Sequence, residues 1–265
     1  AAGTYGEEML RAFTDAGLFN IIRPKRYGGY QYPLDVFIKV AIEISRGDPG
    51  VGWSFVLGAG HTFHLASYFP ERAQDEVFAS DPFIAPSRAV PSGRADRVDG
   101  GYRLSGTWDY NSGCTWSTHT MPVAPVFAAD GSPEGVHMFV VPRDQYVILD
   151  DWGGDHTIGL QASSSNSITI DDVFVPDHMV VPYDFKAHEW GTTGTLGYQL
   201  HQAPMYLGRS LFYFFSELVS TQVGAAWAAL DEYEELMARG TSFPPRIPRT
   251  ESPEFQLWYG KLVAL

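Results

Sequence analysis

The segment Gly101–Trp116, GYRLSGTWDYNSGCTW, decides how the rest of this chain is interpreted. It predicts a strand, a tight turn at Ser105-Gly106, and a second strand that leads into a polar break at Asn111-Ser112-Gly113. Asn, Ser and Gly accept a left-handed or strained backbone and bring short hydrogen-bonding groups. The break is therefore expected to expose N–H groups and a hydroxyl at the end of a strand.

Two aromatic residues, Trp108 and Tyr110, stand beside this break. N–H groups and a hydroxyl next to aromatic rings suit the rim of a flat, polar, heteroaromatic ligand such as a flavin. An ordinary β-turn with incidental aromatic neighbours explains the same residues equally well. The remainder of the chain has to distinguish these two interpretations.

Length, charge and cysteine usage exclude several classes of protein. The 265 residues suffice for one large or two smaller domains with a sizeable core. The formal net charge of −13, without any run of Lys or Arg, argues against nucleic-acid partners and anionic membranes. No apolar stretch approaches the ~20 residues that span a bilayer, and no signal segment stands at the N-terminus, so we expect a cytoplasmic protein. A single cysteine, Cys114, excludes an intrachain disulfide and a cysteine-based zinc site.

The pattern of apolar and turn residues changes along the chain, and the order of these patterns predicts an α+β fold. Residues 1–80 have helical periodicity, including a helix over 51–69 that places His61 and His64 on one face. Residues 81–185 consist of short β-branched or aromatic runs between turn residues, which indicates an antiparallel β-sandwich or barrel. We expect a connecting loop over 186–208 and the beginning of a C-terminal helical domain over 209–265. The last helical run has no stop signal, so we expect that part of the natural protein is absent from this sequence.

Four stretches together resemble a known family, in the order in which that family carries them. The order of helices, strands and helices resembles the acyl-CoA dehydrogenase fold superfamily. Within it the chain is most similar to the oxygenase components of two-component flavin-dependent monooxygenases, the p-hydroxyphenylacetate hydroxylase-like branch. The aromatic-x-Ser-Gly-Cys pattern at 110–114 favours this branch, whereas Gln161-Ala162 differs from the Arg-Gly that relatives often carry. The four stretches are GLFNIIRPKRYGG at 17–29, HTFHLASYFPERAQDEV at 61–77, GGYRLSGTWDYNSGC at 100–114 and GLQASSSNSITIDDVFVP at 159–176.

The resemblance implies an aromatic hydroxylase that uses reduced flavin, FADH2 or FMNH2. Such an enzyme takes reduced flavin from a separate reductase, reacts it with O2 to a C4a-hydroperoxyflavin, and hydroxylates a phenolic or indolic substrate. The absence of a GxGxxG motif before a helix agrees with a separate reductase, because this chain then needs no nicotinamide site. An acyl-CoA dehydrogenase or oxidase on the same fold, or a non-catalytic scaffold, stays open because one fold hosts several functions. The resemblance also implies a homotetramer, and apolar residues on more than one face of the helix over 209–239 agree with it.

The resemblance assigns roles to particular residues. Ser112 is expected beside flavin N5, where a hydroxyl can hold a proton. His61 is expected to act as the base or acceptor at the substrate hydroxyl, for which an imidazole is suited near neutral pH. Ser87 is expected to make a second contact to that hydroxyl. Flavin contacts are expected from the following residues: Tyr110, Asn111, Ser112, Gly113, Ser163 and Ser165.

Each of these residues has a structural alternative that the sequence leaves open. The Ser112 hydroxyl can instead cap its own turn, and His61 can be a core histidine bonded to a backbone carbonyl. Ser87 can be an ordinary serine at the end of a strand, and the serines at 163–165 can belong to a solvated loop. Two histidines three residues apart supply only half a metal site, so we expect no metal. We expect Cys114 to be a buried structural thiol.

Overall fold

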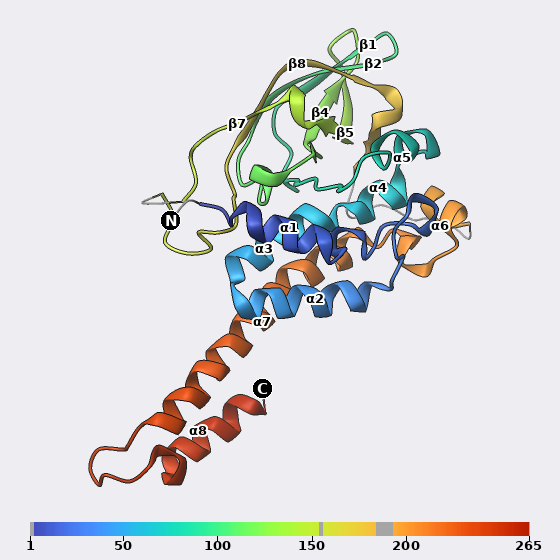
Figure 1. Cartoon of the computed structure of the whole chain (residues 1–265). Coiled ribbons are helices and arrows are strands. Elements are labelled where there is room, and N and C mark those ends of the chain that lie inside the picture. The colour runs from blue at the N-terminus through green and yellow to red at the C-terminus, as the bar shows by residue number, and fades with distance from the viewer. Residues whose placement is uncertain (1–2, 154–155, 184–192, 265) are drawn as a thin grey trace.

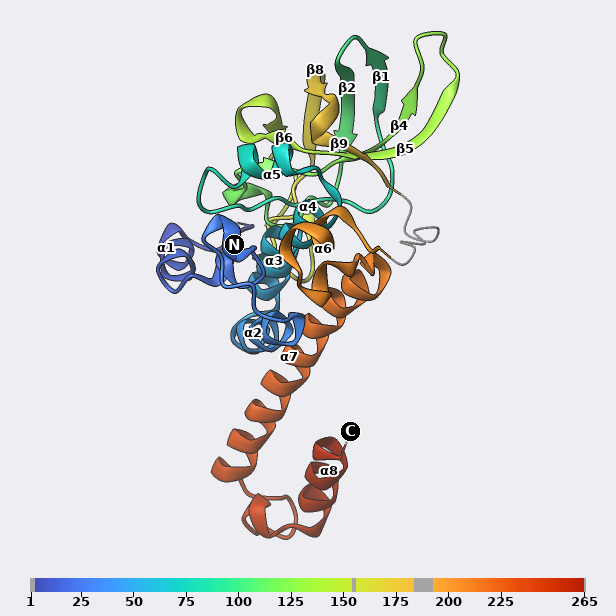
Figure 2. The ribbon, with the colours of Figure 1, turned by 90° about the vertical axis from the view of Figure 1, so that its right-hand side faces the viewer.

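A computed structural model describes residues 3–153, 156–183 and 193–264 of the chain (Figure 1). A β-sheet lies on one side of a group of helices, and a long helical hairpin extends from the opposite side. Figure 2 shows the same arrangement from a direction at right angles. Helices come first, strands second and helices last, so the predicted α+β class is confirmed.

Five helices make up the N-terminal part of the chain. The buried face of the second helix carries Phe37, Ala41 and Ser45, as helical spacing requires, whereas the third helix is buried on almost every side. Asp48 caps the third helix, because its side chain accepts from the N–H groups of Gly50 and Val51. The bounds are α1 Glu7–Asp15, α2 Leu34–Gly47, α3 Pro49–Gly60, α4 Thr62–Tyr68 and α5 Glu71–Val77.

The single helix predicted over 51–69 is divided at His61. Helix α3 ends at Gly60 and α4 begins at Thr62, with His61 between them at φ −66° and ψ −7°. Gly58 and Gly60 precede the break, and glycine is a poor helix former because its backbone is so free when unfolded. His61 and His64 nevertheless lie close together, with ring centroids 5.2 Å apart.

The strands form one open, seven-stranded sheet with a separate two-stranded ribbon. The order is β7-β8-β2-β1-β4-β5-β9, and all neighbours are antiparallel except the parallel pair β1 and β4. Strands β7 and β9 are its edges, so the described strands do not close into a barrel. The ribbon pairs β3 with β6. The bounds are β1 Arg94–Val98, β2 Gly101–Trp108, β3 His119–Thr120, β4 Val123–Phe127, β5 Pro133–Phe139, β6 Val141–Pro142, β7 Val147–Ile148, β8 Ile168–Pro176 and β9 Val180–Pro182.

The tight turn predicted at Ser105-Gly106 is wrong. Strand β2 continues through these residues, and its pairing with β8 shifts register between Leu104 and Gly106, which is a β-bulge. The hairpin turn lies earlier, at Gly100, whose φ of +74° favours glycine. Gly106 marks the bulge because a Cβ there would collide with the backbone of Gly93. Glycine signals a turn and a bulge alike, which explains the error.

The end of β2 fixes the position of the segment that follows it. Trp108, the last residue of β2, is fully buried in the core of the sheet, and its Nε1–H donates to the carbonyl of Val123 at 2.9 Å. The next turn then runs against α3, where a Cβ added at Gly113 would lie 2.8 Å from the carbonyl oxygen of Ser54. The sheet therefore presents the polar break of the sequence directly to helix α3.

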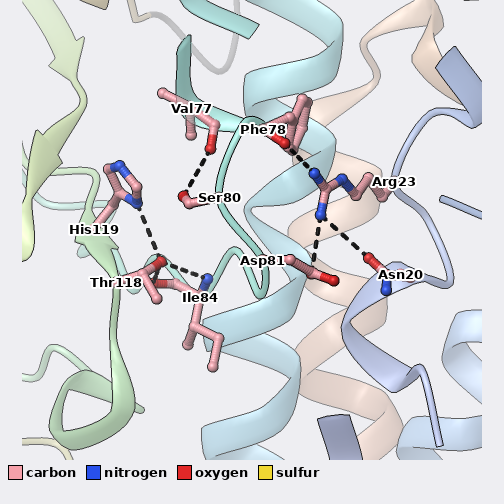
Figure 3. Close-up of polar contacts among 9 residues, drawn as sticks. All are labelled: Asn20, Arg23, Val77, Phe78, Ser80, Asp81, Ile84, Thr118 and His119. Carbon is pink, nitrogen blue, oxygen red and sulfur yellow. Dashed lines mark hydrogen bonds and ion pairs between the residues drawn. The ribbon is translucent and has the colours of Figure 1, made fainter. Parts of the chain in front are cut away.

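The segment between α5 and the sheet is attached on two sides (Figure 3). On the helical side, the buried Arg23 donates to the carbonyl of Phe78 and pairs with Asp81 at 3.0 Å. On the sheet side, the N–H of Ile84 donates to the hydroxyl of Thr118 at 3.1 Å. These contacts join the helices to the strands and keep Ser87, a few residues further on, beside the sheet.

The C-terminal part contains two shorter and two longer helical segments, besides the 3₁₀ turn η8 Arg249–Glu251 that precedes the last helix. They are α6 Leu196–His201, the 3₁₀ helix η7 Pro204–Leu207, α7 Ser210–Arg239 and α8 Pro253–Val263. The segment expected as a connecting loop over 186–208 thus contains α6 and η7, while residues 186–192 lie outside the described residues. The division of the chain into separate domains stays a prediction.

Helix α7 begins within the body and then leaves it, and α8 folds back beside its far half (Figures 1 and 2). Tyr259 of α8 donates to the Glu234 carboxylate of α7 at 2.6 Å. Large apolar side chains are exposed on the first half of α7, among them Phe212, Phe215 and Val219. Among the residues that the structure describes, no helix is both long and apolar enough to cross a membrane.

Candidate active site

A pocket of about 380 Å³ opens where the turn after β2 meets α3 and α7. Its volume is within the ~300–1,000 Å³ range of small-molecule sites. Two other regions of the chain, residues 87–90 and part of 152–165, complete its wall. The lining residues are Trp53 and Leu57 of α3, Ser87–Val90, Tyr110 and Ser112 of the turn, Trp152, Leu160, Ser163 and Ser165, and Phe214 and Leu218 of α7.

The turn after β2 has a backbone conformation that orients its side chains in opposite directions. Tyr110 and Gly113 adopt the left-handed region, at φ +54° and +88°. Asn111 is buried and its Nδ2 donates to the carbonyl of Trp108 at 2.7 Å, while the Gly113 N–H donates to the carbonyl of Ser163 at 2.8 Å. Asn111 and Gly113 therefore shape the turn from behind, and Tyr110 and Ser112 line the pocket.

A row of hydroxyl groups forms one part of the pocket wall. The Nε1–H of Trp53 donates to the Ser112 hydroxyl at 2.9 Å. The Ser112 hydroxyl is 2.7 Å from that of Ser165, which is 2.6 Å from that of Ser163. All three serines are buried. The row joins residues that are far apart in sequence, because Ser112 is 59 residues from Trp53 and 53 residues from Ser165. Sequence analysis identified the serines but not Trp53, whose role depends on the packing of α3 against the turn.

Aromatic rings form a second part of the wall. The ring of Tyr110 is 59% exposed and packs edge-to-face on Trp152, with centroids 6.0 Å apart. The Nε1–H of Trp152 is buried and has no hydrogen-bond partner among the described residues. Buried donors are seldom left unpaired in native proteins, so this donor indicates a ligand acceptor or an ordered water. Aromatic faces with an unused donor fit the ring system of a flavin.

A smaller hollow of about 190 Å³ adjoins the pocket and shares the wall of Tyr110 and Trp152. Asp109 and Asp151 contribute carboxylates to its lining, together with Ser167. Carboxylates repel phosphate and accept hydrogen bonds from hydroxyls. This hollow therefore suits the hydroxyl groups of a ligand better than its phosphate groups.

Ser87 lines the same pocket as the hydroxyl row, in the segment that follows Ala85. Its hydroxyl donates to the carbonyl of Met121 at 2.5 Å, so only its lone pairs remain to bind a ligand, as acceptors. Next to it, Arg88 forms an ion pair with Asp109 at the boundary between the pocket and the smaller hollow.

His61 is not among the residues that line the pocket, although Leu57, one helical turn before it, is. It is 4% exposed, and its Nδ1–H donates to the carbonyl of Leu57 at 2.6 Å. In the neutral ring this tautomer leaves Nε2 as an acceptor. Burial lowers the pKa of His61 to about 4, although hydrogen bonds to the backbone of Leu57 and Ala85 oppose the shift. The imidazole is therefore neutral at pH 7, and its lowered pKa makes it a hydrogen-bond acceptor rather than a strong base.

A buried carboxyl that sequence analysis missed lies behind His61. A Cβ added at Gly60 would overlap the carboxyl of Glu217, and the Tyr213 hydroxyl donates to the Gly60 carbonyl at 2.8 Å. Glu217 is fully buried, and neither of its carboxyl oxygens has a hydrogen-bond partner among the described residues. Burial raises its pKa well above the usual range. The sequence did contain a signal for this residue, because Glu217 is the one charged residue between positions 210 and 230.

Two other groups in this region have structural roles. Burial raises the pKa of the Cys114 thiol to about 11, and the thiol donates to the carbonyl of Ser164 at 3.3 Å, as expected for a structural cysteine. Both ring nitrogens of His64 lack partners among the described residues, and burial next to His61 lowers its pKa. Within those residues no group of three or more potential ligands is arranged for a metal ion.

Two proteins similar to this chain in sequence are both named as oxygenase subunits or components of flavin-dependent enzymes. No protein-family profile matches the chain. It is 34% identical over 201 residues to the flavin-dependent monooxygenase oxygenase subunit HsaA of Mycobacterium tuberculosis, which covers 76% of this chain and 49% of that protein. It is 35% identical over 231 residues to the FADH2-dependent resorcinol hydroxylase oxygenase component of a Rhizobium species, covering 84% and 53%. The chain thus spans about half the length of the curated relatives it matches.

The fold has solved counterparts as well. The crystal structure of the 3-HSA hydroxylase from Rhodococcus sp. RHA1 superposes with a TM-score of 0.85 at 26% identity, over 99% of this chain and 66% of that one. Butyryl-CoA dehydrogenase of Megasphaera elsdenii superposes with a TM-score of 0.74 at 14% identity, over 99% and 68%, which concerns the fold alone.

Proposed function

We propose that this chain, which belongs to the acyl-CoA dehydrogenase fold superfamily and is related to the oxygenase components of its flavin-dependent monooxygenases, gives the whole protein aromatic hydroxylase activity. The substrate is an aromatic ring of phenolic or indolic type. The electrons come from a flavin that a separate reductase delivers in reduced form, and O2 supplies the oxygen atom.

The observation that carries this proposal is the combination of donors and rings in one pocket. The hydroxyl row, the ring of Tyr110 and the Nε1–H of Trp152, which has no partner in the described part of the chain, surround the same space of about 380 Å³. A flavin ring offers acceptors and donors at its edge and flat faces for aromatic contacts. When bound, reduced flavin supplies the activation of O2, which side chains do not provide.

The side chains of this chain then position the flavin and the substrate, hold a proton and exclude water. Ser112 makes a hydrogen bond at flavin N5 and holds the proton on that atom. Leu57, Phe214 and Leu218 contribute apolar surface that excludes water from the ring. His61 lies one helical turn beyond the pocket-lining Leu57, and its Nε2 would accept a hydrogen bond from the substrate hydroxyl, which enriches the aromatic ring in electrons. Ser87 would accept a second hydrogen bond. Tyr110, Asn111, Gly113, Ser163 and Ser165 complete the flavin site.

The direct test is oxygen transfer by the full-length protein. With chemically reduced flavin, ¹⁸O2 and a panel of phenols and indoles, a hydroxylated product should carry one ¹⁸O atom. An acyl-CoA series is the control, since the dehydrogenase alternative predicts reduction of bound oxidised flavin by a thioester. Thioester-dependent reduction without any labelled phenol or indole product would refute the proposal.

Ser112→Ala should redirect turnover from hydroxylation to release of hydrogen peroxide. The loss of one hydroxyl at N5 removes stabilisation of about 1–3 kcal/mol, the scale of an unmade buried hydrogen bond. Product formed per O2 consumed should therefore fall about tenfold, with a smaller loss of affinity for reduced flavin. Peroxide and product are measured in the same reaction, and Ser117→Ala serves as a control because Ser117 is a buried serine outside the pocket. Unchanged coupling in the Ser112 variant would remove this residue from the site.

We also propose a homotetramer, because the apolar residues exposed on the first half of α7 require a cover. Phe212, Phe215 and Val219 are 68%, 55% and 56% exposed on one helix. Contiguous exposed apolar surface of this kind marks association. Light scattering of the full-length protein should give four times the mass of one chain, and a monomeric mass would contradict the proposal.

A further inference from the structure

The hydroxyl row in the pocket wall has a fixed end and a free end. The indole N–H of Trp53 can only donate, so it always occupies one lone pair of the Ser112 oxygen. Ser163 is at the other end, where Ser165 is its hydroxyl's partner among the described residues. Between them, each serine can donate one hydrogen and accept others.

Two directions of hydrogen bonding are compatible with these distances. In the first, Ser163 donates to Ser165 and Ser165 donates to Ser112, so both lone pairs of Ser112 are used and its hydrogen faces the ligand. In the second, Ser112 donates to Ser165 and Ser165 donates to Ser163, so Ser112 can accept from the ligand instead. The second direction leaves the Ser163 hydrogen without an acceptor in the described part of the chain.

We propose that Ser112, Ser165 and Ser163 act as one reversible hydrogen-bond relay, anchored by Trp53, which couples the two ends of the pocket wall. When the ligand presents an acceptor to Ser112, the first direction applies and Ser112 donates its hydrogen to that acceptor. A ligand donor at Ser112 reverses all three hydroxyls, and Ser163 then becomes a donor to a ligand acceptor at its end. Ser165 and Trp53 are positioning residues, since they act through Ser112. The relay rests on the proposed function only for the identity of the ligand.

Flavin is a suitable probe because its N5 changes character with its redox state. Oxidised flavin presents an acceptor at N5, whereas reduced flavin presents an N–H donor there. In the Ser163→Ala variant the second direction leaves the hydroxyl hydrogen of Ser165 without its acceptor. Reduced flavin, which requires this direction, should therefore bind more weakly, while oxidised flavin binds nearly as before. The affinity for reduced flavin should fall about fivefold relative to that for oxidised flavin, the scale of one neutral hydrogen bond.

A double-mutant cycle in the full-length protein tests the coupling. The effect of Ser163→Ala on the ratio of the two affinities should disappear in a Ser165→Ala background, because the middle of the relay is then missing. It should also disappear in Trp53→Phe, where Ser112 regains a lone pair and can accept from the ligand without reversal. Trp116→Phe is the matched control, since its indole N–H donates to the carbonyl of Tyr5 at 3.0 Å outside the pocket. An effect of Ser163→Ala that persists in the Ser165→Ala background would overturn the relay.

A second measurement does not depend on flavin. The ¹⁵N–¹H resonance of the Trp53 indole, assigned from Trp53→Phe, should move in Ser163→Ala but not when Ser165→Ala is already present, and the Trp116 resonance should stay in place. If neither redox form of flavin binds, the proposed function fails while this result still decides the relay. If Ser163→Ala leaves the Trp53 resonance unchanged both alone and together with Ser165→Ala, the relay is refuted.

Discussion

Replacing His61 by asparagine should slow hydroxylation about 10²–10⁴-fold, the usual range for a lost acid–base group, while oxygen consumption by the reduced enzyme continues. Asparagine can keep the donation that the imidazole Nδ1 makes to the Leu57 carbonyl, but it has no atom in place of Nε2. The variant therefore removes the acceptor and conserves the local hydrogen bond. Rapid-mixing measurements of product and oxygen separate the two steps.

The pH dependence of hydroxylation gives an independent check on His61. Because burial lowers the pKa of His61 to about 4, the ring stays neutral and able to accept a hydrogen bond throughout the neutral range. The rate should be flat from pH 7 to about pH 5 and fall towards pH 4, rather than near pH 6.5 as for an exposed histidine.

The alternative for His61, a purely structural core residue, predicts a different outcome. The variant would then lose thermal stability, and every kinetic step would decline together. His61→Gln adds a control, since its longer amide can reach the position of Nε2 and restore an acceptor. A destabilised His61→Asn protein with normal hydroxylation per folded site would end the catalytic assignment.

Replacing Glu217 by methionine should stabilise the protein at neutral pH. The wild-type carboxyl is fully buried beside Tyr213, and burial outweighs this neighbour, so its folded-state pKa is raised. The folded protein therefore holds a proton which the unfolded chain releases above about pH 4.5. The free energy of unfolding therefore falls as pH rises above that value. Methionine has a similar length, is apolar and adapts its shape, so the gain at pH 7 should be about 1–3 kcal/mol and should shrink towards pH 4.

Urea denaturation of the full-length protein at several pH values measures this gain. Glu217→Gln is the matched control, because it keeps the shape and a polar group but cannot ionise, so it should remove the pH dependence with a smaller gain. A methionine variant that is less stable than wild type at pH 7 would mean that the carboxylate has a partner. Loss of activity with higher stability would indicate that the buried carboxyl is retained for function.

Local sequence patterns were sufficient for the order of elements and for much of the pocket wall. The Tyr110–Cys114 break ended a strand as expected, because turn residues act through their own backbone preferences. Tyr110, Ser112, Ser163, Ser165 and Ser87 come together in one pocket, although their functional roles stay predictions.

The features that sequence analysis missed depend on long-range packing or on ambiguous signals. Helical periodicity continues on both sides of His61, so a break of one residue left no trace in the pattern. Trp53 gained its significance only from a contact with Ser112, 59 residues away. Glu217 stood alone in an apolar run, but its burial against Gly60 follows from how α7 crosses α3.

The crossing of α3 by α7 also has a consequence for how the protein is made. The Tyr213 hydroxyl bonds the carbonyl of Gly60, 153 residues earlier in the chain. At synthesis rates of about 5–20 residues per second, roughly 8–30 s separate the emergence of these two residues from the ribosome. During that interval the Gly60 end of α3 has no cover from α7, and the pocket lacks the wall that Phe214 and Leu218 provide. Binding of a ligand in this pocket therefore cannot stabilise the nascent chain fully until α7 has emerged.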